Sequence, residues 1–278
     1  MFSFSKLILP IALFAPCINA TVYLPKGITM QSVQTANIII AWDIHNVPAI
    51  EDGSAKAGAI AGDIFPIIWT KLFDTSAWDE IKRIKKTNKD ISGEAYMQVF
   101  LKHGQKKMAR MAENAANAYK PRPGMLQLVR DIDSAGVVQR LASNIGPQCL
   151  VNLDNKFKSK KYNCNIFDYI KPGKIVDYSM YGPTHLRKAS LAPELSAIGK
   201  PDMGFFIGFN NTYNPNNEYL IIFIDDKMEN IQTAVAAGWI GIHLNVNDKD
   251  PVTTLRSDLT SLGVFAKKQI AKPLIKLA

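Results

Sequence analysis

Three short apolar runs in the chain each end in polar residues. They are residues 36–41 (ANIIIA), followed by Trp42-Asp43; residues 136–142 (GVVQRLA), followed by Ser143-Asn144; and residues 219–224 (YLIIFI), followed by Asp225-Asp226. Apolar runs of this length with polar ends are typical of buried strands. The pattern therefore predicts three strands that deliver polar side chains at their carboxyl ends.

Between these runs, apolar residues recur at helical spacing. Residues 126–134 show this spacing, and so do residues 229–237, which stop at Gly238, a good signal for a helix C-terminus. Residues 239–244 (WIGIHL) then read as a further strand. Alternating strands and helices predict an α/β fold, a Rossmann-like parallel sheet with helices on both faces. In such sheets the ligand lies at the carboxyl ends of the strands.

One long segment departs from this alternation. From about residue 53 to residue 119 the sequence has helical periodicity, basic stretches such as IKRIKK at 81–86, and no persuasive strand. Its lysines are expected on a solvated helix face rather than in a substrate-binding patch. We predict a helical cap at residues 51–119, inserted into a core formed by residues 35–50 and 120–262. The remaining residues 263–278 form a basic and apolar tail, either a docking helix or a loose end.

The first twenty residues read as a signal peptide. Lys6 precedes an almost wholly apolar stretch from Leu7 to Ile18, and Ala20 offers a small residue for cleavage. The mature chain then begins near Thr21, and export to the periplasm or the exterior is expected. The apolar stretch is short for a membrane span, so the mature chain is expected to have no stable span, and an uncleaved N-terminal anchor is the alternative.

The charge and the cysteines narrow the function only slightly. The 278-residue chain has a formal net charge of +9, which suits anionic partners, although its basic residues are scattered. Its lysines are not interleaved with aromatic residues, so nucleic-acid binding is not expected. After cleavage only Cys149 and Cys164 remain, either as a disulfide or as two thiols, and neither has the spacing of a zinc ligand. The oligomeric state stays open.

The polar residues after the strands stand in a particular order. Asp43 comes first, then Ser143-Asn144, then Lys200 in the segment Lys200-Pro201-Asp202, and finally Asp225-Asp226. Each alone is an ordinary turn or helix cap. In this order they resemble the motifs of the haloacid-dehalogenase superfamily of hydrolases, in its branch with a helical cap. The likeness is strongest across residues 121–145 and 200–244.

The resemblance implies a magnesium-dependent hydrolase with Asp43 as its nucleophile. A carboxylate can attack phosphorus and hold the phosphoryl group covalently, which splits one difficult displacement into two steps. Mg²⁺ prefers hard oxygen ligands, which Asp43, Asp225 and Asp226 would supply, and the resemblance adds the backbone carbonyl of His45. The Ser143 hydroxyl and the Asn144 backbone N–H would bind the phosphoryl oxygens. Lys200 would neutralise Asp43 and the bound anion.

His45 departs from the family pattern. Phosphatases of the superfamily have a second aspartate two residues after the nucleophile, as acid and base, whereas this chain reads Asp43-Ile44-His45-Asn46-Val47. One interpretation is that His45 transfers the proton, so that the protein is a phosphatase of a small phosphorylated molecule. Another is a dehalogenase or a phosphonate-cleaving enzyme, although the paired aspartates 225 and 226 favour a metal and phosphorus.

Two further alternatives remain for the segment from Asp43 to Val47. In one, the site binds a phosphorylated ligand with little turnover, on a fold shared with enzymes. In the other, the His45 ring packs beside the nucleophile without transferring protons. The other histidines, His103, His185 and His243, have no partner at a telling spacing, so we expect structural or exposed roles for them.

Overall fold

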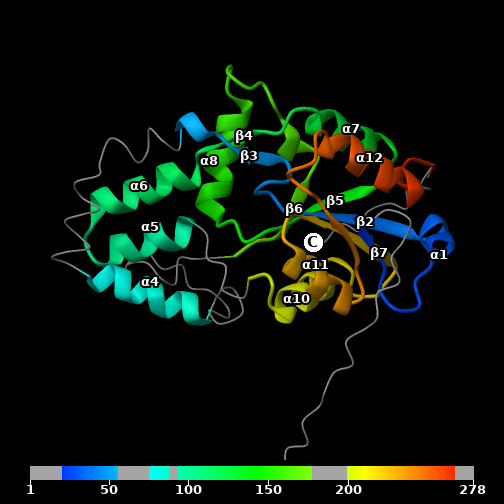
Figure 1. The fold of residues 1–278 in the computed structure, drawn as a ribbon, viewed down its shortest axis with the longest axis horizontal. Helices are drawn as coiled ribbons and strands as arrows, with labels where there is room; N and C mark the ends of the chain where they lie inside the picture. Colours follow the sequence, from blue (N-terminus) through cyan, green and yellow to red (C-terminus); the bar gives the residue numbers. More distant parts are fainter. Residues whose placement is uncertain (1–20, 56–74, 88–92, 177–198, 267–278) are drawn as a thin grey trace, which may run out of the picture.

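The described part of the protein is built around a six-stranded sheet (Figure 1). The structure is a computed structural model that describes residues 21–55, 75–87, 93–176 and 199–266. In spatial order the strands are β1 (Val22–Tyr23), β8 (Ile240–His243), β7 (Tyr219–Asp225), β2 (Asn37–Trp42), β5 (Val138–Ala142) and β6 (Lys171–Lys174). Only the two-residue β1 runs antiparallel to its neighbour. The predicted α/β class with a mostly parallel sheet is confirmed.

The central strand β2 explains where the polar residues gather. It pairs in parallel with β5 and β7, and its last residue, Trp42, lies opposite Leu141 of β5 and Ile224 of β7. The three strands therefore end at nearly the same level. As a result, the residues that follow them in sequence meet at one edge of the sheet.

Alternation along β2 fills a core on each face of the sheet. Ile38, Ile40 and Trp42 face one apolar cluster, and Ile39 and Ala41 face the other. The first cluster includes residues of α1 (Met30–Thr35), α7 (Met125–Ser134), α8 (Pro147–Lys158) and α12 (Pro251–Ser261). The second includes residues of α10 (Met203–Tyr213) and α11 (Met228–Ala236), and Figure 1 shows α7 and α12 opposite α10 and α11.

Three further helices form a separate body beside the sheet. These are α4 (Ser76–Thr87), α5 (Gly93–Lys102) and α6 (Lys106–Ala116), which we term the helical insertion. They share a small apolar cluster that includes Ile81, Met97 and Phe100. On α4, Ile81 and Ile84 are buried, whereas the basic residues between and after them are exposed.

The helical insertion joins the core through two short strands. Strand β3 (Ala49–Glu51) leads out, β4 (Tyr119–Pro121) leads back, and the two pair antiparallel. The expectation that residues 53–119 contain no strand is wrong at Tyr119, and the predicted boundary at residue 51 falls inside β3. A three-residue strand is too short to show a readable alternation of apolar and polar positions.

Some predicted features lie outside the described residues. They include the signal peptide at residues 1–20, His185, and the tail beyond residue 266. The tail residues that are described begin with Gly263 and a short 3-10 helix, η4 (Val264–Ala266), in which Val264 is buried. A second short 3-10 helix, η1 (Ile166–Asp168), precedes β6. Of the helices described, none has both the length and the apolar character needed to cross a membrane.

Candidate active site

Asp43 lies in a tight turn at the end of β2. Its backbone N–H donates to the carbonyl of Ile224 at 3.0 Å, which extends the pairing of β2 with β7 by one residue. The chain then turns, because the Ile44 carbonyl accepts the N–H groups of Val47 and Ala49. Asn46 adopts a positive φ of 59°, which asparagine tolerates better than most residues. The Asp43 side chain is thereby held at the edge of the sheet, almost fully buried.

Lys200 bridges two carboxylates at this edge. Its ammonium Nζ lies 2.8 Å from Asp43 Oδ1 and 2.6 Å from Asp225 Oδ2, and all three side chains are buried. Burial works against charge on Lys200, but the two carboxylates outweigh it and raise its pKa. Burial also opposes ionisation of Asp43, yet Lys200, His45 and the Ser143 hydroxyl together hold the pKa of Asp43 below its ordinary value. Asp43 is therefore an ionised carboxylate beside a cation.

Asp225 serves mainly to hold other groups in place. Its Oδ2 accepts from Lys200 and from the Asn230 side chain at 2.9 Å, and its Oδ1 accepts the Lys227 backbone N–H at 2.8 Å. Burial raises the pKa of Asp225 most strongly; Lys200 opposes that rise and the Asp43 charge adds to it. Both oxygens are occupied by protein donors, so this residue anchors Lys200 and the start of α11.

Asp226 is the more open of the paired aspartates. Its Oδ2 accepts the Asn46 side-chain amide at 2.9 Å, and the ring nitrogen Nε2 of His243 donates to its backbone carbonyl at 3.0 Å. Burial raises the pKa of the Asp226 carboxyl, against the effect of the Asn46 hydrogen bond. Oxygens of Asp43, Asp225 and Asp226 all lie within 4.8 Å of one another. This spacing and donor set suit a divalent cation with oxygen ligands.

The segment after β5 completes the cluster. The Ser143 hydroxyl hydrogen-bonds Asp43, and its backbone N–H donates to the carbonyl of Lys174 at 3.1 Å. Asn144 pairs with the backbone of Lys200 in both directions: its Oδ1 accepts the N–H at 2.7 Å, and its amide donates to the carbonyl at 2.8 Å. The Asn144 side chain therefore positions Lys200 through both of its polar atoms.

Arg122 supports the nucleophile turn from outside. Its guanidinium donates to the carbonyls of Asn46 and Val47, the latter at 2.7 Å, and its backbone N–H donates to the carbonyl of Pro48. Burial lowers the pKa of Arg122, and attraction to Asp226 acts in the opposite direction. Three hydrogen bonds from one residue therefore fix the turn that presents Asp43 and His45.

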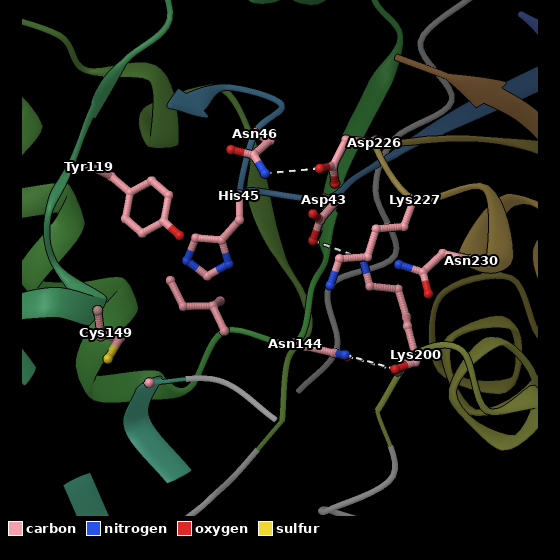
Figure 2. A pocket seen from close by; sticks show the side chains of 13 residues that line it. Asp43, His45, Asn46, Tyr119, Asn144, Cys149, Lys200, Asp226, Lys227 and Asn230 are labelled. Atoms are coloured by element: carbon pink, nitrogen blue, oxygen red, sulfur yellow. Dashed lines mark hydrogen bonds and ion pairs between the residues drawn. The ribbon is translucent and has the colours of Figure 1, made fainter. Parts of the chain in front are cut away.

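A cavity of about 210 Å³ opens beside these residues (Figure 2). Asp43, Asp226 and Lys227 lie on one side of it, and Tyr119 and Cys149 lie on the other. The His45 ring points into the cavity and contacts the Tyr119 ring, with the centroids 4.6 Å apart. Tyr119 belongs to β4, which leads back from the helical insertion, and the insertion itself contributes Gly93 of α5 and Ala116 of α6 to the wall.

The structure brings the predicted site residues together. Asp43, His45, Asn144, Lys200 and Asp226 line the cavity. Ser143 and Asp225 are fully buried, and both hydrogen-bond the groups that line it.

The remaining histidine of the helical insertion and the two cysteines were not predicted as site residues. His103 contacts Glu80 at 2.7 Å within the helical insertion, away from the cavity. Cys149 and Cys164 are both free and buried, and burial followed by the charge of Glu94 raises the pKa of the Cys149 thiol. Neither cysteine forms the disulfide that the sequence left open.

Several contributors to the site were absent from the prediction. They include Asn46, Arg122, Lys227 and Asn230, besides the wall residues Tyr119 and Cys149. Asn230 had a usable signal, because a polar residue five positions after a strand-end aspartate lies in the first turn of the next helix and can bond back to it. Arg122 had none, since its acceptors are backbone carbonyls more than seventy residues away in the chain.

Comparison with known proteins gives a distant structural likeness. No protein-family model matches the chain, and no curated protein sequence matches it. An enzyme of the HAD family from Bacteroides thetaiotaomicron, in complex with magnesium and inorganic phosphate, is 15% identical; the match covers 77% of this chain and 97% of that chain, with a TM-score of 0.49. The L-2-haloacid dehalogenase from Xanthobacter autotrophicus, with chloropropionic acid covalently bound, is 13% identical over 86% and 92%, with a TM-score of 0.47. At these values neither the fold described above nor the function proposed below rests on the likeness.

Proposed function

We propose that this chain is a hydrolase of the haloacid-dehalogenase superfamily, a magnesium-dependent phosphatase of small phosphorylated molecules that acts through an aspartyl-phosphate on Asp43. One observation carries the proposal. Lys200 pairs with both Asp43 and Asp225 in the buried end of the sheet, at 2.8 and 2.6 Å. A carboxylate can attack an anionic phosphate only where a cation offsets their repulsion, and Lys200 supplies that cation.

The residues present fit a magnesium ion. The carboxylates of Asp43 and Asp226 would hold it, together with the backbone carbonyl of His45, whose role as a ligand was predicted from the sequence. Asp225 is left out of this set because both of its oxygens already accept protein donors. When bound, Mg²⁺ would offset negative charge on the phosphoryl oxygens. Asn46 would then act as the residue that orients Asp226.

The reaction divides into two displacements. In the first, a carboxylate oxygen of Asp43 bonds to phosphorus, the ester P–O bond breaks, and the leaving oxygen takes a proton from His45. In the second, His45 removes a proton from a water molecule whose oxygen attacks phosphorus, which releases inorganic phosphate and restores Asp43. The Ser143 hydroxyl, which hydrogen-bonds Asp43, would turn to donate to a phosphoryl oxygen once the substrate is bound.

His45 is the acid and base in this proposal. Its charge acts on Asp43, and its ring faces the cavity against Tyr119. An imidazole can donate and accept a proton near neutral pH, as the missing aspartate would. The same ring contact also suits a histidine that only packs, which favours a second candidate function: a protein that binds a phosphorylated ligand with little turnover.

Hydrolysis of p-nitrophenyl phosphate tests these candidates. With Mg²⁺ the wild type should release nitrophenol, and EDTA or Asp43→Asn should lower the rate at least ~10³-fold, because the nucleophile or its cation is lost. Asp133→Asn, a change at an exposed aspartate, is the matched control. Full activity in Asp43→Asn would show that the nucleophile is wrong. An inert wild type with an active His45→Asp variant would favour the binding protein, and magnesium-independent chloride release from 2-chloropropionate would favour a dehalogenase.

We also propose that the chain is exported and begins near Thr21 in its mature form. The support is the charged start, apolar stretch and small residue of positions 1–20. Mass spectrometry of the N-terminus after cell fractionation tests this. An intact Met1 in a membrane fraction would instead show the N-terminal anchor.

A further inference from the structure

Lys227 is a second lysine at the cavity, beside the Lys200 of the proposed mechanism. It follows Asp226 directly and lines the cavity, partly buried. Figure 2 shows its side chain reaching into the cavity from the side that carries Asp226. Its backbone is fixed, because its N–H donates to Asp225 Oδ1 at 2.8 Å.

The position of Lys227 in its helix is locally unfavourable. It is the N-cap of α11, and its side chain makes no capping hydrogen bond. N-caps favour serine, threonine, aspartate and asparagine, and a positive charge is disfavoured beside the positive end of a helix. Local helix stability therefore does not explain a lysine here. A residue that breaks a local preference at a cavity points to a role in binding.

Lys227 concentrates positive charge at one part of the cavity wall. The ammonium of Lys200 is already paired with Asp43 and Asp225. The charge of Lys227 acts on Asp226, and the start of α11 adds partial positive charge nearby. Lys227 is thus a second cation at the cavity, beside the one that pairs with the nucleophile.

The size of the cavity limits what this centre can bind. A volume of about 210 Å³ holds a phosphoryl group and a few further atoms. Asp43 and Lys227 line the same small space. A ligand with its phosphoryl group at Asp43 therefore has its neighbouring atoms within reach of Lys227.

We infer that Lys227 binds a carboxylate of the substrate, so that the substrate class is small phosphorylated carboxylic acids. This inference rests on the proposed function and adds the second group that the cavity recognises. An ammonium and a carboxylate form a charge-assisted hydrogen bond, which is stronger than one to a neutral group of the same shape. A neutral amide in place of the carboxylate should lose that advantage.

Binding of two phosphonates that resist hydrolysis tests the inference. Calorimetry with Mg²⁺ would compare 3-phosphonopropionate with 3-phosphonopropionamide, which differ only in the charge of one end. The wild type should bind the acid about tenfold more tightly, the usual effect of one charge-assisted hydrogen bond. Lys227→Arg should keep the preference, and Lys227→Ser should bring the ratio of the two Kd values to about one.

The variants are chosen so that folding and net charge do not confuse the result. Serine is a preferred N-cap, so Lys227→Ser should keep α11, and a thermal melt checks this; Lys227→Gln replaces it if the serine variant does not fold. Lys249→Ser removes the same charge from an exposed position and should keep the wild-type ratio.

Two results would overturn the inference. Equal binding of acid and amide by the wild type would do so, and so would a wild-type ratio in Lys227→Ser. Inorganic phosphate separates the two levels of the proposal. If phosphate binds with Mg²⁺ but the acid has no advantage, only the role of Lys227 is wrong. If phosphate does not bind, the proposed function fails and this inference fails with it.

Discussion

The strand-end site and the helical insertion use the same kind of ion pair in opposite settings. The side chains of Lys200 and its two carboxylate partners are at most 9% exposed, whereas the pair of Lys82 and Asp79 on α4 is 72% and 57% exposed. Water screens the second pair, and solvating either partner alone costs little there. In the site, removing one partner leaves a charge buried without compensation. Burial, rather than the length of the ion pair, therefore makes Lys200 more important than Lys82 for the stability of the protein.

The two regions also meet at a buried carboxylate. Glu94, at the start of α5, is 3% exposed and accepts the backbone N–H of Cys149 at 3.1 Å, in the first turn of α8. The N-cap of α8 is Gly146, which has no side chain to cap the helix. A Cβ at Gly146 would lie 2.0 Å from Glu94 Oε2, so glycine makes room for the contact. The insertion thereby caps the helix that follows Ser143 and Asn144.

Substitution of Lys200 should have the largest effect. Lys200→Met leaves Asp43 and Asp225 buried without their cation, and we expect a loss of about 3–5 kcal/mol in the free energy of unfolding. Urea denaturation followed by circular dichroism measures it. Lys82→Met on α4 is the matched control and should melt like the wild type. A loss below about 1 kcal/mol in Lys200→Met would contradict the importance given to burial.

The contact between Glu94 and α8 should come next. Glu94→Ala removes a charged acceptor from the buried Cys149 N–H at the helix start, with an expected cost of about 1–3 kcal/mol. Glu113 provides a matched comparison, because it also joins the insertion to α8, through the Asn152 amide at 3.1 Å, but it is only partly buried. Glu113→Ala should cost less than about 1 kcal/mol. Equal losses in urea denaturation would show that capping is not what Glu94 contributes.

Asn46 separates the backbone requirement of the site from its side-chain requirement. Asn46→Gly keeps the positive φ but loses the bond to Asp226, and the Mg²⁺ concentration for half-maximal activity should rise about tenfold. Asn46→Ala should show the same rise and an added loss of about 1 kcal/mol from strain at positive φ. Magnesium titrations and melts measure the two effects. An unchanged magnesium requirement in both variants would remove Asn46 from the metal site.

The smallest effect is expected on the outer face of the insertion. Asp79→Ala breaks the pair with Lys82 and a bond from Thr75, all in solvent. The melting temperature and any phosphatase rate should stay within error of the wild type. A clear loss of melting temperature or of rate would mean that Asp79 makes a contact other than with solvent. A pull-down with the purified chain would then test whether a partner protein binds this face.

The sequence predicted the parts of the molecule whose cause is local. Strands β2, β5, β7 and β8 are apolar runs, and their polar ends meet because parallel strands finish at one edge. Strand β6 escaped prediction because its sequence, KPGK, has no apolar residue and only edge pairing to define it. Glu94 and Arg122 escaped it as well, because each bonds backbone groups far away in sequence. Such contacts exist only once the chain has folded.

The strand pair β3 and β4 has a consequence for how such proteins diversify. Ala49 pairs with Pro121, Glu51 pairs with Tyr119, and the Asp52 N–H donates to the carbonyl of Ala118 at 2.8 Å. The entrance and the exit of the insertion are therefore neighbours. Segments of other lengths can therefore be inserted between β3 and β4 without changing the register of the six-stranded sheet. Selection can then alter what enters the cavity while Asp43 and Lys200 stay where they are.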